Sequence, residues 1–290
     1  MDAQPESERP KFSFVVTCRN DDYGGNLLNR SSTFVRVLSL LVEKYKVPSE
    51  LVFVEYNPIP GKKYLFEELS APHTSYMQIR GVIVPSEFHE CIRGENPSPF
   101  MEYIAKNIGV RRARGEYILV TNPDIIFSDE LFSFFSKEDS LRQDTFYRVS
   151  RYDLLVRTFD ENLTLEQIFR ICRKKIEKIL YNKRVIYRSY TAWLKRFIRA
   201  RSRKTLRMFP LLEKSVEKND AIIHDMAAGD FLLAHHTLWE KATGYDETPL
   251  CSYMDGYILY VLQCFGFKQK VLEYPIYHIC LLYTSPSPRD

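Results

Sequence analysis

Apolar residues in the first half of the chain follow two different periods. Short runs rich in β-branched residues at positions 12–17, 51–58 and 78–85 predict buried strands. Between the first two runs, apolar residues recur every three or four positions from Leu27 to Tyr45, which predicts an amphipathic helix. Strands that alternate with helices indicate an α/β domain with a largely parallel sheet.

A second helix and a further strand follow. Pro99 is favoured in the first turn of a helix and Gly115 just past a helix end, so we expect a helix between them. Residues 116–130 predict a strand that breaks at Pro123 and carries Asp124 into a loop, because proline cannot donate to a sheet. Ligands of open α/β sheets bind at the carboxyl ends of strands, which makes this loop a candidate site.

The segment 166–214 differs in composition, with 16 Lys and Arg residues against three Glu residues. Its apolar residues fall on two amphipathic helical patterns, formed by Ile168, Cys172, Ile176 and Ile179, and then by Ile186, Tyr190, Trp193 and Phe197. We therefore expect a basic helical insertion over about 160–215.

Regular elements return after this insertion. Residues 227–247 predict a strand, a short helix and a glycine turn, and residues 270–279 predict a final strand. Residues 253–267 predict a helix, and its buried face consists of Ile258, Val261, Leu262 and Phe265.

Composition narrows the class of protein. With 45% hydrophobic residues in 290, the chain can bury a sizeable core, which excludes wholesale disorder. The net charge of +4 does not indicate a polyanionic partner, and we expect no nucleic-acid binding. The six cysteines are scattered singly, as is typical of a reducing compartment. We therefore expect a cytoplasmic protein without a signal peptide or transmembrane helix.

Both ends of the chain are expected to lie outside the domain. Residues 1–11 are polar and predict a disordered lead-in. Residues 280–290 (CLLYTSPSPRD) resemble one reading frame of a transposon adapter used in sequencing libraries, and a natural Ser/Pro-rich tail is the alternative. We accordingly expect a single domain over residues 12–279.

A divalent cation would fit the loop that follows the strand at 116–130. Mg²⁺ and Mn²⁺ prefer oxygen ligands, and one or two protein carboxylates suffice because phosphates and water supply the rest. Asp124 leaves the strand edge, and the amide of Asn122 lies two residues earlier on the same side. A plain turn is the alternative, since Asn and Pro both favour turns.

Four motifs, in this chain order, resemble family-2-like glycosyltransferases of the GT-A fold. Residues 12–21 (FSFVVTCRND) resemble the first strand and base-binding loop, and residues 54–58 (VEYNP) the end of the second strand. Residues 106–124 (KNIGVRRARGEYILVTNPD) resemble the helix, strand and DxD-type motif of that family. The fourth motif has two parts: residues 227–247 resemble the acceptor-side segment, and residues 254–262 (MDGYILYVL) resemble the helix start that follows it.

The resemblance covers about residues 12–136 and 221–279. It implies a GT-A, Rossmann-like α/β domain whose central sheet is mixed, mostly parallel and flanked by helices. The implied activity is inverting transfer of a sugar from a nucleotide-diphosphate donor, a UDP-sugar by preference, to a hydroxyl acceptor. The cofactor would be Mn²⁺ or Mg²⁺, and the acceptor a saccharide or a lipid-linked sugar.

The resemblance also implies roles for individual residues. Nucleoside contacts fall to Thr17, Arg19, Asn20, Asp21 and Glu55. Asn107 and Arg111 would face the diphosphate. Asn122 would assist the metal ligands Asp124 and His278.

Asp255 would accept the proton of the acceptor hydroxyl, with Asp230 and Asp225 as rivals for that role. Two positions depart from the family pattern. Asn122 stands where the family has an Asp, and Met254 stands where a Glu precedes the catalytic Asp. Both departures lower the negative charge of the site.

Other functions remain open on these residues. A nucleotidyltransferase would want a Gly-rich phosphate loop with a Lys after the first strand, but Gly24-Gly25 comes without that Lys. A catalytically degenerate GT-A protein that only binds ligand or docks at a membrane is another alternative. The basic segment 166–214 is either a solvated helical pair or a peripheral contact with anionic membrane, since Trp193 and Phe197 lie among Lys and Arg residues.

Overall fold

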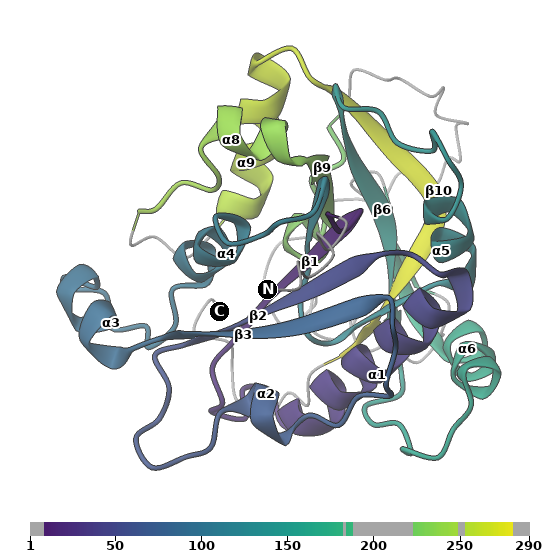
Figure 1. Ribbon diagram of the computed structural model, residues 1–290, viewed down its shortest axis with the longest axis horizontal. Coiled ribbons are helices and arrows are strands. Elements are labelled where there is room, and N and C mark those ends of the chain that lie inside the picture. Colours follow the sequence, from purple (N-terminus) through teal and green to yellow (C-terminus); the bar gives the residue numbers. More distant parts are fainter. Residues whose placement is uncertain (1–8, 182–183, 188–222, 249–252, 281–290) are drawn as a thin grey trace, which may run out of the picture.

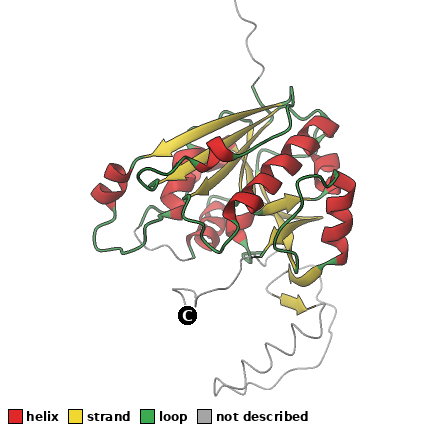
Figure 2. Cartoon of the chain, turned by 90° about the horizontal axis from the view of Figure 1, so that it is seen from below, coloured by secondary structure: helices red, strands yellow, loops and turns green. Residues whose placement is uncertain are grey.

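The computed structural model describes residues 9–181, 184–187, 223–248 and 253–280. One mixed sheet runs through this part of the chain, with helices on both faces (Figure 1). Its strand order is β3–β2–β1–β4–β9–β6–β10–β5, and a hairpin of β7 and β8 extends from β6. Figure 2 shows from a second direction how the helices pack against the strands.

Four strands form the parallel half of the sheet: β1 (Phe12–Cys18), β2 (Ser49–Tyr56), β3 (Met77–Val84) and β4 (Tyr117–Val120). Side chains of β1 alternate between two cores, as successive residues of a strand must. Phe14 packs in the core that contains α1 (Leu27–Tyr45), and Val15 packs in the core that contains α4 (Glu102–Val110). Burial on both faces explains why these strands are continuous apolar runs.

The other half of the sheet mixes directions. β9 (Leu232–His235) pairs antiparallel with β4 and with β6 (Thr145–Leu154). β10 (Lys268–Ile279) runs parallel to β6 and antiparallel to β5 (Ile125–Phe127). Four of the seven pairings along the described path are parallel, so the predicted mixed, mostly parallel sheet flanked by helices is confirmed.

The remaining described helices are α2 (Leu65–Glu68), α3 (Ser86–Ile92), α5 (Asp129–Phe135), α6 (Leu165–Lys174), the 3-10 turn η1 (Ala228–Asp230), α8 (His236–Ala242) and α9 (Met254–Cys264). α8 and α9 lie beside α4 (Figure 1), and Trp239 and Ile258 share its core. Gly244, at φ +79°, forms the predicted turn after α8. None of the described helices is long and apolar enough to cross a membrane.

The helical prediction for the first part of the basic insertion is only half right. Ile168 and Cys172 are buried on α6, which begins with a capping box between Thr164 and Gln167. The following residues instead form the hairpin of β7 (Ile176–Tyr181) and β8 (Arg184–Tyr187), because β7 pairs with β6 and its backbone groups are bonded there. The predicted pattern of Tyr190, Trp193 and Phe197 lies outside the described residues, as do 1–8 of the lead-in and 281–290 of the tail.

Two predicted helix boundaries are shifted. α4 begins at Glu102, three residues after Pro99. It ends at Val110, well before Gly115, whose place is set by its close approach to β1. Phe265 was predicted to be buried but is 55% exposed, because α9 ends one residue earlier and the side chain leaves the buried face.

Candidate functional site

The chain crosses the carboxyl edge of the sheet where β4 ends. β9 begins at Leu232, opposite Val120, so the residues after β4 meet those before β9. Thr121 Oγ1 donates a hydrogen bond to the carbonyl oxygen of Asp230 at 2.7 Å. Asn122 Nδ2 donates to Asp230 Oδ1, also at 2.7 Å. Asn122 therefore joins the DxD-like loop to the acceptor-side segment.

Asp124 lies two residues further, immediately before β5, between two cationic side chains. Arg30 of α1 donates through Nη1 to Asp124 Oδ2 at 2.7 Å. His278 Nε2 lies 3.6 Å from the same oxygen. Pairing of β10 with β5 sets His278 opposite Ile125, and this register brings the two predicted metal ligands together.

A second carboxylate, Asp153 of β6, lies behind His278. Its Oδ1 is 3.1 Å from His278 Nδ1, so the two ring nitrogens face two different carboxylates. Arg151 and Lys178 each pair with Asp153 at 2.8 Å, and Arg151 also bridges to Asp230. These residues form one polar group, called the carboxylate cluster below: Arg30, Asn122, Asp124, Arg151, Asp153, Lys178, Asp230 and His278.

The charges of the carboxylate cluster perturb one another. Burial would raise the pKa of Asp124, but His278, then Arg30 and Arg151, hold that pKa below its ordinary value. Burial would lower the pKa of His278, but the facing carboxylates of Asp124 and Asp153 raise it well above its ordinary value. Burial would likewise raise the pKa of Asp153, yet the surrounding cations keep it well below its usual range. These shifts favour the ionised carboxylates of Asp124 and Asp153 beside a protonated imidazole of His278.

Two atoms of the carboxylate cluster fit a divalent cation. Within the described residues, Asp124 Oδ1 is buried and has no hydrogen-bond partner. His278 Nε2 becomes a ligand once its proton leaves, and a carboxylate at Nδ1 is the usual outer partner that orients a metal-bound histidine. Ligand atoms of Asp153, His278 and Cys280 also lie within 4.8 Å of one another, but Cys280 belongs to the segment that resembles an adapter.

The loop after β1 contains three of the residues predicted to bind a nucleoside. Arg19 Nε donates to the carbonyl oxygen of Asn57 at 2.8 Å, and Arg19 Nη1 pairs with Asp21 at 3.1 Å. Asn20 Nδ2 donates to the carbonyl oxygen of Lys63 at 2.9 Å. These contacts fix the loop to the segment that follows β2, at the same edge of the sheet.

Thr17 and Glu55, the other two predicted nucleoside contacts, lie near the ends of β1 and β2 and are 4% and 1% exposed. In the described part of the chain, Thr17 Oγ1 and Glu55 Oε1 lack hydrogen-bond partners. Glu55 Oε2 accepts from the backbone amide of Leu65, at the start of α2. Burial is the main cause that raises the pKa of Glu55 to about 7. Glu55 is thus an interior group beneath α2.

Asn107 and Arg111, predicted to face the diphosphate, lie against the turn after α8. Asn107 is 1% exposed, and its amide group both donates to and accepts from the backbone of Tyr245, at 2.8 Å each. Arg111 pairs with Glu247 at 2.6 Å, with the Arg111 side chain 54% exposed. Among the described contacts, neither residue touches the carboxylate cluster; Asn107 instead holds the Gly244 turn.

Asp255, the predicted base, lies in the first turn of α9. Its Oδ2 accepts a hydrogen bond from the backbone amide of Gly229 at 2.8 Å. Gly229 and Asp230 are consecutive in η1, so this turn connects Asp255 with the carboxylate cluster. Asp255 is only partly buried, which leaves it open to an acceptor.

The two rival bases are differently engaged. Both oxygens of Asp230 accept hydrogen bonds, one from Asn122 and one from Arg151. Asp225 accepts from the hydroxyl of Tyr260 at 3.3 Å. Because both oxygens of Asp230 are engaged where β4 ends and β9 begins, the geometry favours Asp255 over Asp230 as a base.

Two fully buried cations hold the backbone that leads into η1. Arg148 of β6 is 0% exposed, and its guanidinium donates to three carbonyl oxygens, those of His224, Met226 and Ala228. Burial is the main cause that lowers the pKa of Arg148 to about 10. Lys106 of α4, also 0% exposed, donates to the carbonyl oxygen of Gly229 at 2.9 Å. Together they fix the turn whose amide binds Asp255.

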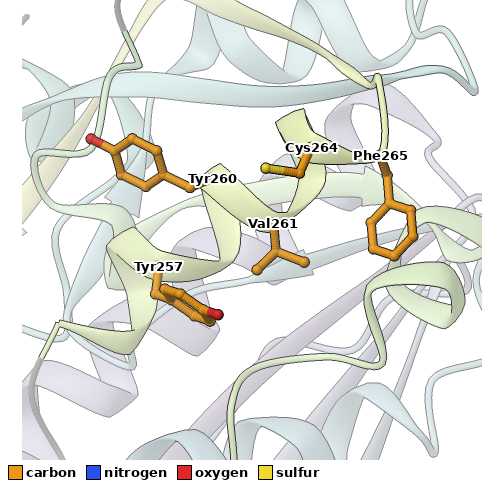
Figure 3. Close-up of a pocket in the computed structure, with 5 residues that line it drawn as sticks. All are labelled: Tyr257, Tyr260, Val261, Cys264 and Phe265. Atoms are coloured by element: carbon orange, nitrogen blue, oxygen red, sulfur yellow. The ribbon is translucent and has the colours of Figure 1, made fainter.

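Two hollows of the surface lie apart from the carboxylate cluster, and one of them adjoins the loop after β1. One of about 300 Å³ is formed on α9 by Tyr257, Tyr260, Val261, Cys264 and Phe265 (Figure 3). With 3.6 residues per turn, Tyr257 lies about 200° around the helix from Asp255, so this hollow faces away from the base. Another, of about 870 Å³, lies between the first half of α1 and the loops at 68–72 and 159–162. Neither includes a residue of the carboxylate cluster, but Asp22 and Asn26, in the loop after β1, line the second.

Five residues that hold the candidate site together were not expected from the sequence: Lys178, Arg30, Arg148, Arg151 and Asp153. The last three lie on β6, and the run TFYRVSRYDL, rich in aromatic residues and with polar residues interspersed, was a strand signal that could have identified that element. Arg30 gave no local signal, because its partner Asp124 is 94 residues away.

Comparisons with known proteins find only distant structural likenesses. No protein-family model and no curated protein matches the chain. Among solved structures, GalNAc-T7 with UDP, GalNAc and Mn²⁺ is 13% identical over 97% of this chain and 45% of its own, with a TM-score of 0.49. S. aureus TarS is 11% identical over 92% of this chain and 36% of its own, with a TM-score of 0.46.

The mannosyltransferase PcManGT from Pyrobaculum calidifontis, in complex with GDP-Man and Mn²⁺, is 10% identical over 94% of this chain and 58% of its own, with a TM-score of 0.44. The chain thus spans about a third to three fifths of the length of these structures. At such identities and TM-scores the likeness assigns no role to any residue.

Proposed function

We propose that the chain is a glycosyltransferase that transfers a sugar from a nucleotide-diphosphate donor, a UDP-sugar, to a hydroxyl group of a saccharide or lipid-linked acceptor. The observation that carries the proposal is that His278 lies between the carboxylates of Asp153 and Asp124 at the carboxyl edge of the sheet. The turn η1 connects this group to Asp255, which accepts a hydrogen bond from the amide of Gly229. This arrangement unites a candidate cation site with a carboxylate that can accept a proton, in a sequence that resembles GT-A enzymes.

Asp124 and His278 would hold the cation. When bound, a divalent cation neutralises the diphosphate leaving group. The carboxylate oxygen suits both Mg²⁺ and Mn²⁺, whereas the imidazole nitrogen favours a transition metal, so we propose Mn²⁺. The nucleoside would lie over the loop after β1, held by the side chains of Arg19, Asn20 and Asp21, whereas Thr17 and Glu55 are buried beneath that loop and α2.

Asp255 would act on the acceptor. Its carboxylate takes the proton of the acceptor hydroxyl as that oxygen forms a bond to the anomeric carbon of the donor. The bond between the anomeric carbon and the diphosphate oxygen breaks, and the nucleoside diphosphate leaves with the electron pair. Attack opposite the leaving group inverts the anomeric configuration.

The test is release of nucleoside diphosphate from a panel of UDP-sugars, with and without Mn²⁺. We expect turnover that depends on Mn²⁺ and falls by at least about 100-fold in Asp124→Asn and in Asp255→Asn. Asp129→Asn is the matched control, since Asp129 is a surface residue paired with Lys44, and it retains full turnover. Binding of UDP without turnover would favour a degenerate binding protein, and no binding of any nucleotide would refute the proposal.

A group of exposed basic residues on α6 supports peripheral contact with anionic membrane. Arg170, Arg173, Lys174 and Lys175 are exposed on and just after α6. Clustered basic residues bind anionic lipid in a salt-dependent manner. Co-sedimentation with phosphatidylserine vesicles at low and high salt tests this, and a chain that stays in the supernatant at low salt contradicts it.

A further inference from the structure

A single buried guanidinium connects the loop after β1 to the candidate metal ligand. Arg30 is 2% exposed and uses all of its donor nitrogens. Nη1 binds Asp124 Oδ2 at 2.7 Å, Nε binds the carbonyl oxygen of Gly25 at 3.2 Å, and Nη2 binds the carbonyl oxygen of Tyr23. Arg30 therefore contacts both the candidate metal ligand and the loop after β1 (residues 19–26), which is called the nucleoside loop below.

This loop is held in an unusual backbone conformation. Asp22, Gly24, Gly25 and Asn26 all have positive φ, between 56° and 75°. Asp and Asn adopt such angles more readily than other non-glycine residues, but four positive φ angles in five positions still need contacts that hold the backbone. The two carbonyl oxygens bound by Arg30 lie inside this stretch, so the guanidinium is one of the contacts that enforce it.

Arg30 also neutralises the carboxylate that a cation would need. A guanidinium keeps its charge in proteins, so Asp124 has a fixed counter-charge beside it whether or not a cation is bound. A divalent cation on Asp124 Oδ1 would stand within a few ångströms of the guanidinium on Oδ2. At an effective dielectric constant of about 20, repulsion between such charges is large compared with thermal energy.

We propose that Arg30 is an internal counter-ion of Asp124 that competes with the divalent cation and so couples cation binding to the nucleoside loop. The inference rests on the proposed function. When a cation occupies Asp124, the Arg30–Asp124 pair weakens and the hold of Arg30 on the carbonyl oxygens of Tyr23 and Gly25 loosens. The opposite expectation is that Arg30 merely orients Asp124, in which case its loss would weaken cation binding.

Mn²⁺ titration followed by electron paramagnetic resonance of the free ion separates the two. We expect Arg30→Met to bind Mn²⁺ about tenfold more tightly than the wild type, because the competing charge is gone. Arg30→Lys keeps a positive charge, so its Mn²⁺ affinity should stay near that of the wild type. Arg36→Met is the matched control: Arg36 lies on the same helix but binds the carbonyl oxygen of Asp160, and its loss leaves Mn²⁺ affinity unchanged.

A second measurement uses the wild-type chain alone and covers the case in which Arg30→Met does not fold. Uridine has no phosphate to contact the cation, so any effect of Mn²⁺ on its calorimetric affinity must pass through the protein. We expect Mn²⁺ to weaken uridine binding at least about fivefold. Mn²⁺ affinity that is unchanged or weaker in Arg30→Met, or uridine affinity indifferent to Mn²⁺, overturns this inference alone. Failure of every variant to bind Mn²⁺ overturns it together with the proposed cation site.

Discussion

Asp153 and His278 face each other across the parallel pair β6 and β10, with Asp153 Oδ1 3.1 Å from His278 Nδ1. The register of the two strands places them directly opposite each other. This contact leaves Nε2 of the ring as the nitrogen directed at Asp124. The carboxylate of Asp153 therefore decides which side of the imidazole is available to a metal.

Asp153→Asn is expected to lower Mn²⁺ affinity by about 10- to 100-fold, because loss of an outer-shell carboxylate releases the ring and lowers its basicity. Mn²⁺ titration by electron paramagnetic resonance measures this directly. Asp144→Asn, at an exposed position before β6, is the control and leaves the affinity as it is. Equal affinities of Asp153→Asn and the wild type would show that Asp153 does not support a metal ligand.

Glu55 makes the folded state less stable as the pH rises. Its pKa is raised from 4.5 to about 7 by burial, so the folded chain binds a proton that the unfolded chain has lost. The free energy of unfolding should fall between about pH 4.5 and pH 7, by up to about 3 kcal/mol. Glu55→Gln, which can still accept from Leu65, should remove this slope and be the more stable protein at pH 8.

Urea unfolding of the wild type and Glu55→Gln from pH 4.5 to pH 8 measures the difference between their profiles. Exposed Glu87 provides the control, since Glu87→Gln should keep the wild-type profile. Parallel profiles for Glu55→Gln and the wild type would contradict the assignment.

Arg148→Met should destabilise the chain by about 2–4 kcal/mol, because three carbonyl oxygens, those of His224, Met226 and Ala228, lose their donor in the interior. Urea unfolding at neutral pH measures the change. Arg142→Met removes a guanidinium that is 71% exposed and should leave the stability nearly unchanged. If Arg148→Met lost as little stability as this control, the three carbonyl oxygens would have to find other hydrogen-bond donors.

Gly115→Ala should destabilise the fold by about 1–3 kcal/mol, because an added Cβ has no room. It would lie 2.5 Å from the backbone nitrogen of Ser13 and 2.7 Å from the carbonyl carbon of Phe12, and a backbone cannot turn away as a side chain can. Gly256→Ala is the matched control: its nearest neighbour is 4.0 Å away within α9, so helix propensity predicts a gain of about 0.5–1 kcal/mol. Thermal unfolding should therefore move in opposite directions for the two variants.

Several elements could be predicted because their signals are local. The strands β1, β2, β3 and β10 and the helix α1 agree with the apolar periods of the sequence to within two or three residues. β6 was overlooked, although its run of aromatic and branched residues is a strand signal. The sequence predicts a helix where the structure has the hairpin of β7 and β8. A short apolar run is compatible with either a helix or a strand, and here pairing with the edge of β6 makes it a strand.

The sequence likewise indicates only some residues of the candidate site. Asp124 and His278 were singled out by a resemblance of motifs, and the structure brings them to 3.6 Å. Arg30 was overlooked because an arginine on an amphipathic helix is ordinarily a solvated residue. Its burial follows from a carboxylate that is distant in the sequence.

The sequence by itself determined the α/β class and the strand end from which Asp124 emerges, since both depend on the order of neighbouring residues. Only the tertiary structure decided which charges meet at that strand end. Asn122 and Asp230 are 108 residues apart, and Asp153 and His278 are 125 apart. Insertion of β9 between β4 and β6, and of β10 between β6 and β5, brings them into contact. Strand order is set by burial and pairing over the whole sheet, and no local pattern encodes it.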